Sequence, residues 1–117
     1  MPRGSAEYRT RAAPPGPTPN SDLLHRGQER YAIFCVPCHG GAGYGDGVVV
    51  RRGFPAPPSF HDPSLKEITP ARVVSVVTDG SGKMLSLAEQ IPPRDRWAIA
   101  WYVKALQRSQ DPAGGAP

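Results

Sequence analysis

The sequence predicts an all-α fold of three to five helices. Apolar and small residues recur at helical spacing after residue 20, a Thr-Pro pair opens a second segment at residues 69–70, and Pro92-Pro93 opens a third, strongly apolar one. A hydroxyl residue followed by proline is a typical helix start. A chain of 117 residues is expected to form one small domain around these segments.

The chain is rich in loops and has a modest apolar content. It contains 15 prolines and 13 glycines, and only 38% of its residues are hydrophobic, which is low for a self-sufficient core. We expect an extended proline-rich arm over residues 1–20, a helical domain over 21–110 and a flexible tail over 111–117. The arm either stays in solvent or lies along a partner subunit.

The first helix is expected over residues 21–34, with Ser21 or Asp22 as its N-cap. Leu24, Gly27, Tyr31 and Phe34 recur at steps of three and four, so they share one face. A glycine inside a helix costs about 1 kcal/mol relative to alanine. Gly27 therefore predicts that another backbone or a ring approaches the helix closely at this point.

Residues 40–62 are expected to be mostly loop. Residues 40–47 are glycine-rich and lack the lysine of a phosphate-binding loop. Residues 48–50 are three valines and are predicted as a short strand. Residues 54–60 are rich in proline, which favours extended backbone.

The second helix is expected to run from Thr69-Pro70 to about Asp79 and to stop at Gly80. Its apolar residues are mostly valines, which are mediocre helix formers, so a strand is the alternative. A turn over residues 80–83 then leads to Met84, and residues 86–90 are predicted to form a single helical turn.

The last helix is expected to begin at Pro92-Pro93 and to reach about Arg108. Asp95 lies in its first turn, and Lys104 and Arg108 lie near its end, where the helix dipole favours positive charge. Residues 97–103 are all apolar or aromatic, so this helix is expected to be covered on more than one side.

One motif carries most of the chemistry, Cys35-Val36-Pro37-Cys38-His39. It holds the only two cysteines of the chain, with a histidine directly after the second. This is the attachment pattern of c-type haem. Each thiol adds across one vinyl group of the porphyrin to form a thioether, and His39 then binds the iron. A haem would also supply apolar surface that this chain lacks.

The motif has three other interpretations. A structural zinc site usually needs four protein ligands, and beyond the cysteines only His25, His39 and His61 remain. A thioredoxin-like redox pair needs a strand–helix–strand context. A disulfide between Cys35 and Cys38 would leave His39 unexplained.

Met84 is the predicted second axial ligand of the iron. It is the only internal methionine, and thioether ligation raises the reduction potential relative to two histidines. The alternative is that Met84 fills space in the core. His25 and His61 are weaker candidates, and His61 is more typical of a loop-bonding histidine.

Further residues are expected to surround the haem. The Nδ1 proton of His39 needs an acceptor, and a carbonyl in residues 55–58, with Pro58 as the named residue, is the candidate. The haem propionates need donors or cations. Arg51, Arg52 and Trp97 are candidates, and Tyr44 is another possible donor.

The net charge of +4 comes from scattered basic residues. No run of lysine and arginine marks a nucleic-acid-binding arm. The charge indicates a solvated basic surface or steering toward an acidic redox partner. No apolar run reaches the roughly 18–20 residues of a membrane helix. No signal peptide is visible in residues 1–10 either, although c-type haem is normally attached outside the cytoplasm.

The chain resembles a class I cytochrome c. Gly27 and Tyr31 precede Cys35 by the spacing of that family, and the pair Ile99 and Tyr102 matches its C-terminal helix. A methionine in a loop before the last helix is also the family arrangement, although Leu85 stands where proline is common. The resemblance implies a cytochrome c fold, with three to five helices around one covalently attached haem c.

A narrower likeness is to the mono-haem cytochrome c subunit of bacterial alternative complex III, over about residues 23–110. Its most specific parts are Arg52-Gly53-Phe54-Pro55 and the segment 57–62, followed by 90–99. This resemblance implies a one-electron carrier, not an enzyme, working in a quinol-oxidising respiratory or photosynthetic complex. Its partners would be other subunits, including a multi-haem cytochrome, in the periplasm or on the outer face of the cytoplasmic membrane.

Two alternatives stay open at this point. One is a freely diffusing periplasmic cytochrome c. The other is a haem enzyme or sensor whose sixth coordination site is open, which requires that Met84 does not bind the iron.

Overall fold

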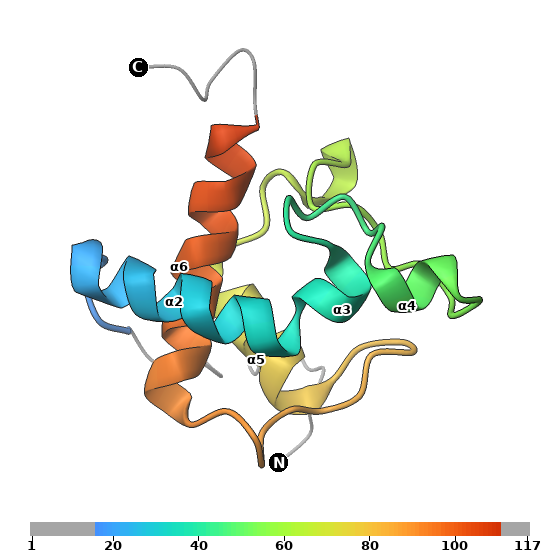
Figure 1. Ribbon diagram of the computed structural model, residues 1–117. Helices are drawn as coiled ribbons and strands as arrows, with labels where there is room; N and C mark the ends of the chain where they lie inside the picture. The colour runs from blue at the N-terminus through green and yellow to red at the C-terminus, as the bar shows by residue number, and fades with distance from the viewer. Residues whose placement is uncertain (1–15, 111–117) are drawn as a thin grey trace.

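The computed structural model describes residues 16–110, and Figure 1 shows their arrangement. Within this range the helices are α2 (Ser21–Phe34), α3 (Val36–His39), α4 (Val48–Arg51), α5 (Pro70–Asp79) and α6 (Pro93–Ser109), with a 3-10 turn over Pro63–Leu65. These residues form no strand, only an isolated bridge between Ser81 and Met84. The all-α prediction is confirmed. Of the predicted arm only residues 16–20 are described, and they form neither helix nor strand; the predicted tail lies outside the described residues.

The centre of the fold is the crossing of α2 over α6 (Figure 1), and α5 packs against α6 as well. At the crossing, a Cβ added to Gly27 would collide with the carbonyl group of Ala98. The predicted close approach at Gly27 is therefore confirmed, and the approaching group is the backbone of α6. Beside it, both carboxylate oxygens of Asp95 accept hydrogen bonds of 3.0 Å from the Arg26 guanidinium.

The two long helices at this crossing begin differently. The N-cap of α2 is Asn20, whose side-chain oxygen accepts a 2.8 Å hydrogen bond from the Leu23 N–H. The prediction of Ser21 or Asp22 as the cap is wrong by one or two residues, because both already lie inside the helix. α6 opens at Pro93, as Pro92-Pro93 predicted.

The valine-rich segment is a helix, and its strand alternative is wrong. Thr69 caps α5 by accepting a 3.1 Å hydrogen bond from the Arg72 N–H. Val73, Val74 and Val77 are buried on one face. The cap and this burial outweigh the unfavourable helix propensity of valine, which costs roughly a few tenths of a kcal/mol per residue relative to alanine.

Two short predictions need correction. Residues 48–50 form part of helix α4, not a strand; the N–H groups of Val50 and Arg51 both bond the Gly47 carbonyl. No strand lies in the described range to pair with them, so they satisfy their backbone locally. The helical turn predicted over 86–90 is a turn over residues 88–90, closed by bonds from Gln90 and Ile91 to Leu87.

Candidate functional site

The two cysteines and His39 lie on one short stretch of helix. Cys35 joins α2 to α3, and its N–H donates to the Tyr31 carbonyl at 2.8 Å. The His39 N–H in turn donates to the Cys35 carbonyl at 2.8 Å. Residues three and four positions apart on a helix lie on the same face, so both thiols and the imidazole are presented together.

The two thiols differ in environment. Cys35 is 7% exposed and belongs to the core cluster, whereas Cys38 is exposed, and both are free. Burial, with a smaller contribution from Cys38, raises the pKa of Cys35 to about 12. A reactive redox cysteine needs a lowered pKa. The structure therefore disfavours a thioredoxin-like pair and leaves both sulfurs available for thioethers.

His39 is held as a neutral, oriented ring. Burial lowers its pKa, which favours the uncharged imidazole that binds metals. Its ring stacks on Phe60, with centroids 4.6 Å apart and planes inclined by 13°. Its Nδ1 atom is buried without a hydrogen-bond partner. The predicted bond to a carbonyl in residues 55–58 is therefore not formed; the Pro57 carbonyl lies against Gly45 instead.

The glycine-rich loop folds back on this helix. The Gly45 N–H donates to the His39 carbonyl at 2.8 Å, and the Phe60 N–H donates to the Gly43 carbonyl at 2.8 Å. The buried Tyr31 hydroxyl donates to the Gly40 carbonyl at 2.7 Å. Gly43 and Gly45 have positive φ, which a side chain would disfavour. The glycines thus let the loop lie close to the backbone of His39 on one side and to that of Phe60 on the other.

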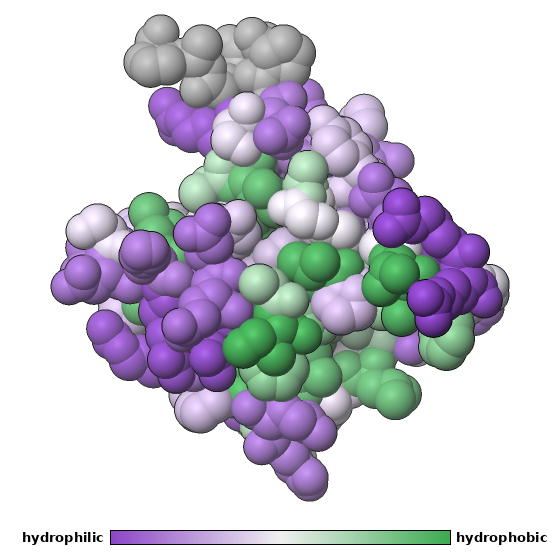
Figure 2. All heavy atoms as spheres, in the orientation of Figure 1, coloured by the Kyte–Doolittle hydropathy of each residue, from purple (hydrophilic) through white to green (hydrophobic). Residues whose placement is uncertain are grey.

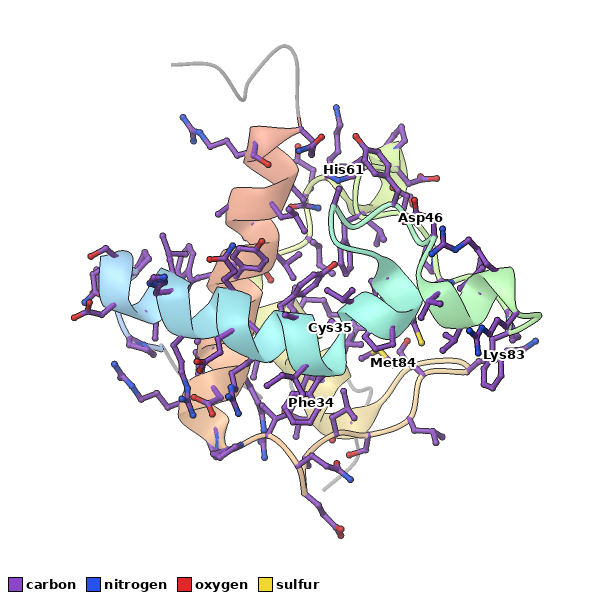
Figure 3. All side chains as sticks on the ribbon, viewed as in Figure 1. Phe34, Cys35, Asp46, His61, Lys83 and Met84 are labelled. Atoms are coloured by element: carbon purple, nitrogen blue, oxygen red, sulfur yellow. The ribbon has the colours of Figure 1, made fainter. Side chains whose placement is uncertain are left out.

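Met84 lies on the loop between α5 and α6. It is half-buried and packs against the core cluster that includes Cys35. Its N–H and carbonyl exchange hydrogen bonds of 2.8 and 2.9 Å with Ser81. Figure 3 shows Lys83 at the outer end of this loop and Met84 nearer the body of the molecule. The side chain next to it, Leu85, is 81% exposed.

The predicted propionate partners are dispersed. Arg52 is exposed at the end of α4. Trp97 is near the start of α6, where a Cβ on Gly16 would collide with its ring. The Tyr44 hydroxyl donates to Gln110 just beyond α6, at 3.2 Å. Trp97 and Gln110 are separated by about 20 Å along the helix axis. Trp97 and Tyr44 therefore do not serve one edge of a haem together.

The two remaining histidines have other settings. His61 lies on Tyr44, with ring centroids 4.4 Å apart, and its Nε2 is 2.7 Å from the Ala42 carbonyl. This is the loop-bonding arrangement that the sequence indicated. His25 is exposed on α2.

Comparisons with known proteins agree with this geometry. The family profile described as cytochrome C oxidase, cbb3-type, subunit III matches residues 22–103. The chain belongs to this family. It is a c-type cytochrome that carries electrons by means of covalently bound haem c. A search of the curated proteins finds no significant match.

Solved structures also resemble the cytochrome, among them the following two. One is described as "Kuenenia stuttgartiensis reducing HAO-like protein complex Kustc0457/Kustc0458", with a TM-score of 0.69 and 27% identity. That alignment covers 80% of this chain but 48% of the other, so the cytochrome spans about half the length of that protein. The second is the KustC0563 c-type cytochrome, with a TM-score of 0.58, 20% identity, and 69% and 96% of the two chains covered. The second likeness shows the fold.

The residues present fit a covalent haem. Cys35 and Cys38 are free thiols one helical turn apart, and a neutral imidazole that stacks on Phe60 follows them. Among residues 16–110 no group of three His, Cys, Asp or Glu side chains gathers as a metal site. No helix in the same range is long and apolar enough to cross a membrane.

Sequence reasoning overlooked three residues around the ligand candidates. Phe60 was noted only as part of a motif, yet it stacks on His39. The Gln107 amide on α6 donates to the carbonyls of Phe60 and Leu65, at 2.8 and 2.9 Å, and so ties that segment to the helix. The Arg96 guanidinium donates to the carbonyls of Ile91 and Ala88, and so ties the segment that follows Met84 to α6. The contacts of Phe60 and Gln107 join residues far apart in the chain, so no local pattern signals them; the Arg96 bonds reach back only 5 and 8 residues.

Proposed function

We propose that this cytochrome is a mono-haem electron carrier in which Cys35 and Cys38 form the thioethers and His39 and Met84 bind the iron. The observation that carries the proposal is the single helical face that presents both thiols and an oriented, neutral imidazole. Haem iron with these ligands takes up and releases one electron at a time.

The protein residues have distinct tasks in this proposal. Phe60 limits rotation of the His39 ring by stacking on it. Tyr31, whose hydroxyl bonds Gly40, fixes the loop directly after His39 to the rigid α2 helix. Met84 is offered from a turn that two backbone hydrogen bonds with Ser81 close, so its backbone is held in place. A fixed ligand set keeps the change in structure between the two oxidation states small.

The electron-transfer partners are proposed to be proteins that dock on an apolar face. Figure 2 shows hydrophobic side chains gathered over α3 and α4 and along the loop that precedes α6. Exposed apolar residues include Val48 on α4, Phe54 just after α4 and Leu85 on the loop before α6, at 45%, 63% and 81% exposure. With a net charge of +4 on the chain, association is expected to be faster with acidic partners and to slow as salt is added.

We further propose that the partners are subunits of a quinol-oxidising complex, alternative complex III, outside the cytoplasm. The support is the resemblance over residues 52–62 and 90–99. The solved relative from Kuenenia stuttgartiensis is itself described as part of a complex. Extraction of native membranes with mild detergent tests this: co-purification with a multi-haem cytochrome supports it, and recovery of the protein alone in the soluble fraction supports a freely diffusing carrier.

Haem attachment and iron ligation are tested on the purified protein. Covalent haem c remains with the polypeptide through acid-acetone extraction and gives a pyridine haemochrome; loss of the haem would contradict the proposal. The ferric protein should show the weak far-red absorption band of a thioether-bound iron. M84A should lose the band, and the matched control L85A should keep it. A wild-type protein without the band that binds CO readily would instead be the open-site enzyme or sensor.

A further inference from the structure

Arg96 connects α6 to both ends of the loop that carries Met84. Its half-buried guanidinium donates from Nε to the Ile91 carbonyl at 2.8 Å and from Nη2 to the Ala88 carbonyl at 3.0 Å. Its Nη1 donates to the Thr78 hydroxyl at 3.3 Å. Thr78 lies in the last turn of α5, before Met84, whereas Ala88 and Ile91 follow it.

Other hydrogen bonds tie this loop to α5. The Leu87 N–H donates to the Val77 carbonyl at 2.9 Å, and the Ser86 hydroxyl donates to the Thr78 carbonyl at 2.6 Å. Both of these bonds anchor the loop to α5. In the described structure Arg96 is the side chain of α6 that hydrogen-bonds to the flanks of this loop. Its three bonds therefore position the loop relative to α6.

The Thr78 hydroxyl is suited to this arrangement. It donates its own proton to the Val74 carbonyl at 2.7 Å, so its oxygen is oriented to accept from Arg96. A guanidinium is planar and offers several N–H donors in fixed directions, whereas an ammonium is a compact point charge. Lysine could therefore replace part of this set of bonds, and glutamine less of it.

We propose that Arg96 is a positioning residue that holds the Met84 loop in the geometry needed for iron ligation. The inference rests on the proposed role of Met84 as a ligand. If Arg96 is removed, the loop gains alternative conformations in which the sulfur is away from the iron. If the loop conformation in which Met84 can bind the iron is populated for a smaller fraction of the time, Met84 competes less well with an added iron ligand.

The experiment measures how tightly imidazole displaces the thioether from the ferric protein, by loss of the far-red band. R96Q should bind imidazole about tenfold more tightly than wild type, and R96K should lie between the two. R96Q should also lose the band at a lower pH and have a lower reduction potential. T78V, which removes one acceptor and leaves Arg96 in place, should shift imidazole binding in the same direction by about twofold to threefold.

Two variants serve as controls. R94Q removes an exposed arginine two residues away, whose charge acts on Asp95. D95N weakens the bond to Arg26 at the helix crossing and so lowers stability without touching the loop. Both should keep imidazole affinity within about twofold of wild type, because neither residue contacts the loop acceptors.

The outcomes separate the two proposals. A band that is present in wild type and lost in M84A, with equal imidazole affinity in R96Q and D95N, would overturn the role of Arg96 and leave the ligation intact. A band that is absent from wild type, or retained in M84A, would overturn both. Should R96Q fail to fold, unchanged imidazole affinity in both R96K and T78V would also reject the inference.

Discussion

The helix crossing and the two segments that carry the ligand candidates are built in different ways. The crossing of α2 and α6 is formed by long helices, with fully buried Tyr31, Ile99 and Val103 and a glycine that lets the backbones meet. Residues 36–62 and 80–91 contain only short helices and turns. A few side chains tie them down, among them Tyr31, Gln107 and Arg96.

This difference indicates that the helix crossing provides most of the stability, whereas the two ligand-bearing segments set the iron ligation. Burial of large apolar side chains stabilises the crossing, at about 25 cal/mol per Å² of apolar surface. The two ligand-bearing segments bury fewer of them; Phe54 and Leu85 are among the exposed large apolar residues. Phe54 and Leu85 belong to the proposed docking face, whereas the haem is expected to supply an apolar partner for the half-buried side chains of these segments. Small changes there should affect ligation more than the fold.

The largest effect is expected from preventing haem attachment. In the double variant C35A/C38A, residues 36–62 and 80–91 should lose their native structure, while α2 and α6 keep residual helix. Amide hydrogen exchange should then show at least about tenfold weaker protection in these segments than in residues 98–107. Equal protection throughout would mean that the segments fold without the cofactor and that the comparison is wrong.

A smaller but still large effect is expected from G27V. The added side chain collides with the Ala98 backbone, which cannot move without shifting α6. Overpacking of this kind costs typically about 1–3 kcal/mol, and we expect the upper end, measured by denaturant unfolding of the haem-bound protein. The matched control is G41A, where an added Cβ meets nothing within 4 Å. Comparable losses in the two variants would contradict the importance of the crossing.

The smallest effect is expected from D95N, and it depends on pH. The hydrogen bond from Arg26 is the main cause that lowers the pKa of Asp95. Because the folded pKa lies below the unfolded one, this carboxylate stabilises the fold above the unfolded pKa, and the effect is lost as the pH falls through the folded pKa. Wild type should exceed D95N by about 1 kcal/mol above roughly pH 5, since Arg26 is half-exposed.

This difference should shrink below about pH 4, as the wild-type carboxylate takes up its proton. The measurement is the free energy of unfolding of both proteins across this pH range. A difference that stays constant down to pH 3 would mean that the charge of Asp95 is not its cause.

Local patterns predicted most of the helices. Thr69-Pro70 and Pro92-Pro93 marked helix starts that the structure confirms, because capping and proline geometry act within a few residues. The same reasoning misassigned residues 48–50, since whether valines form a strand depends on a partner strand that a local pattern does not reveal. The cap at Asn20 was missed because its neighbours Ser21 and Asp22 are equally good capping residues.

The sequence by itself determined the cofactor, because Cys35, Cys38 and His39, the residues proposed to hold it, are close along the chain and one helical turn suffices to bring them together. Only the tertiary structure decided which residues orient those groups. Phe60 stacks on His39 from a separate loop, and Arg96 bonds Thr78 on the far side of the Met84 loop. The tertiary structure also places Trp97 and Tyr44 at opposite ends of α6. Their positions along this helix, which the sequence motifs do not give, decide whether both can contact one ligand.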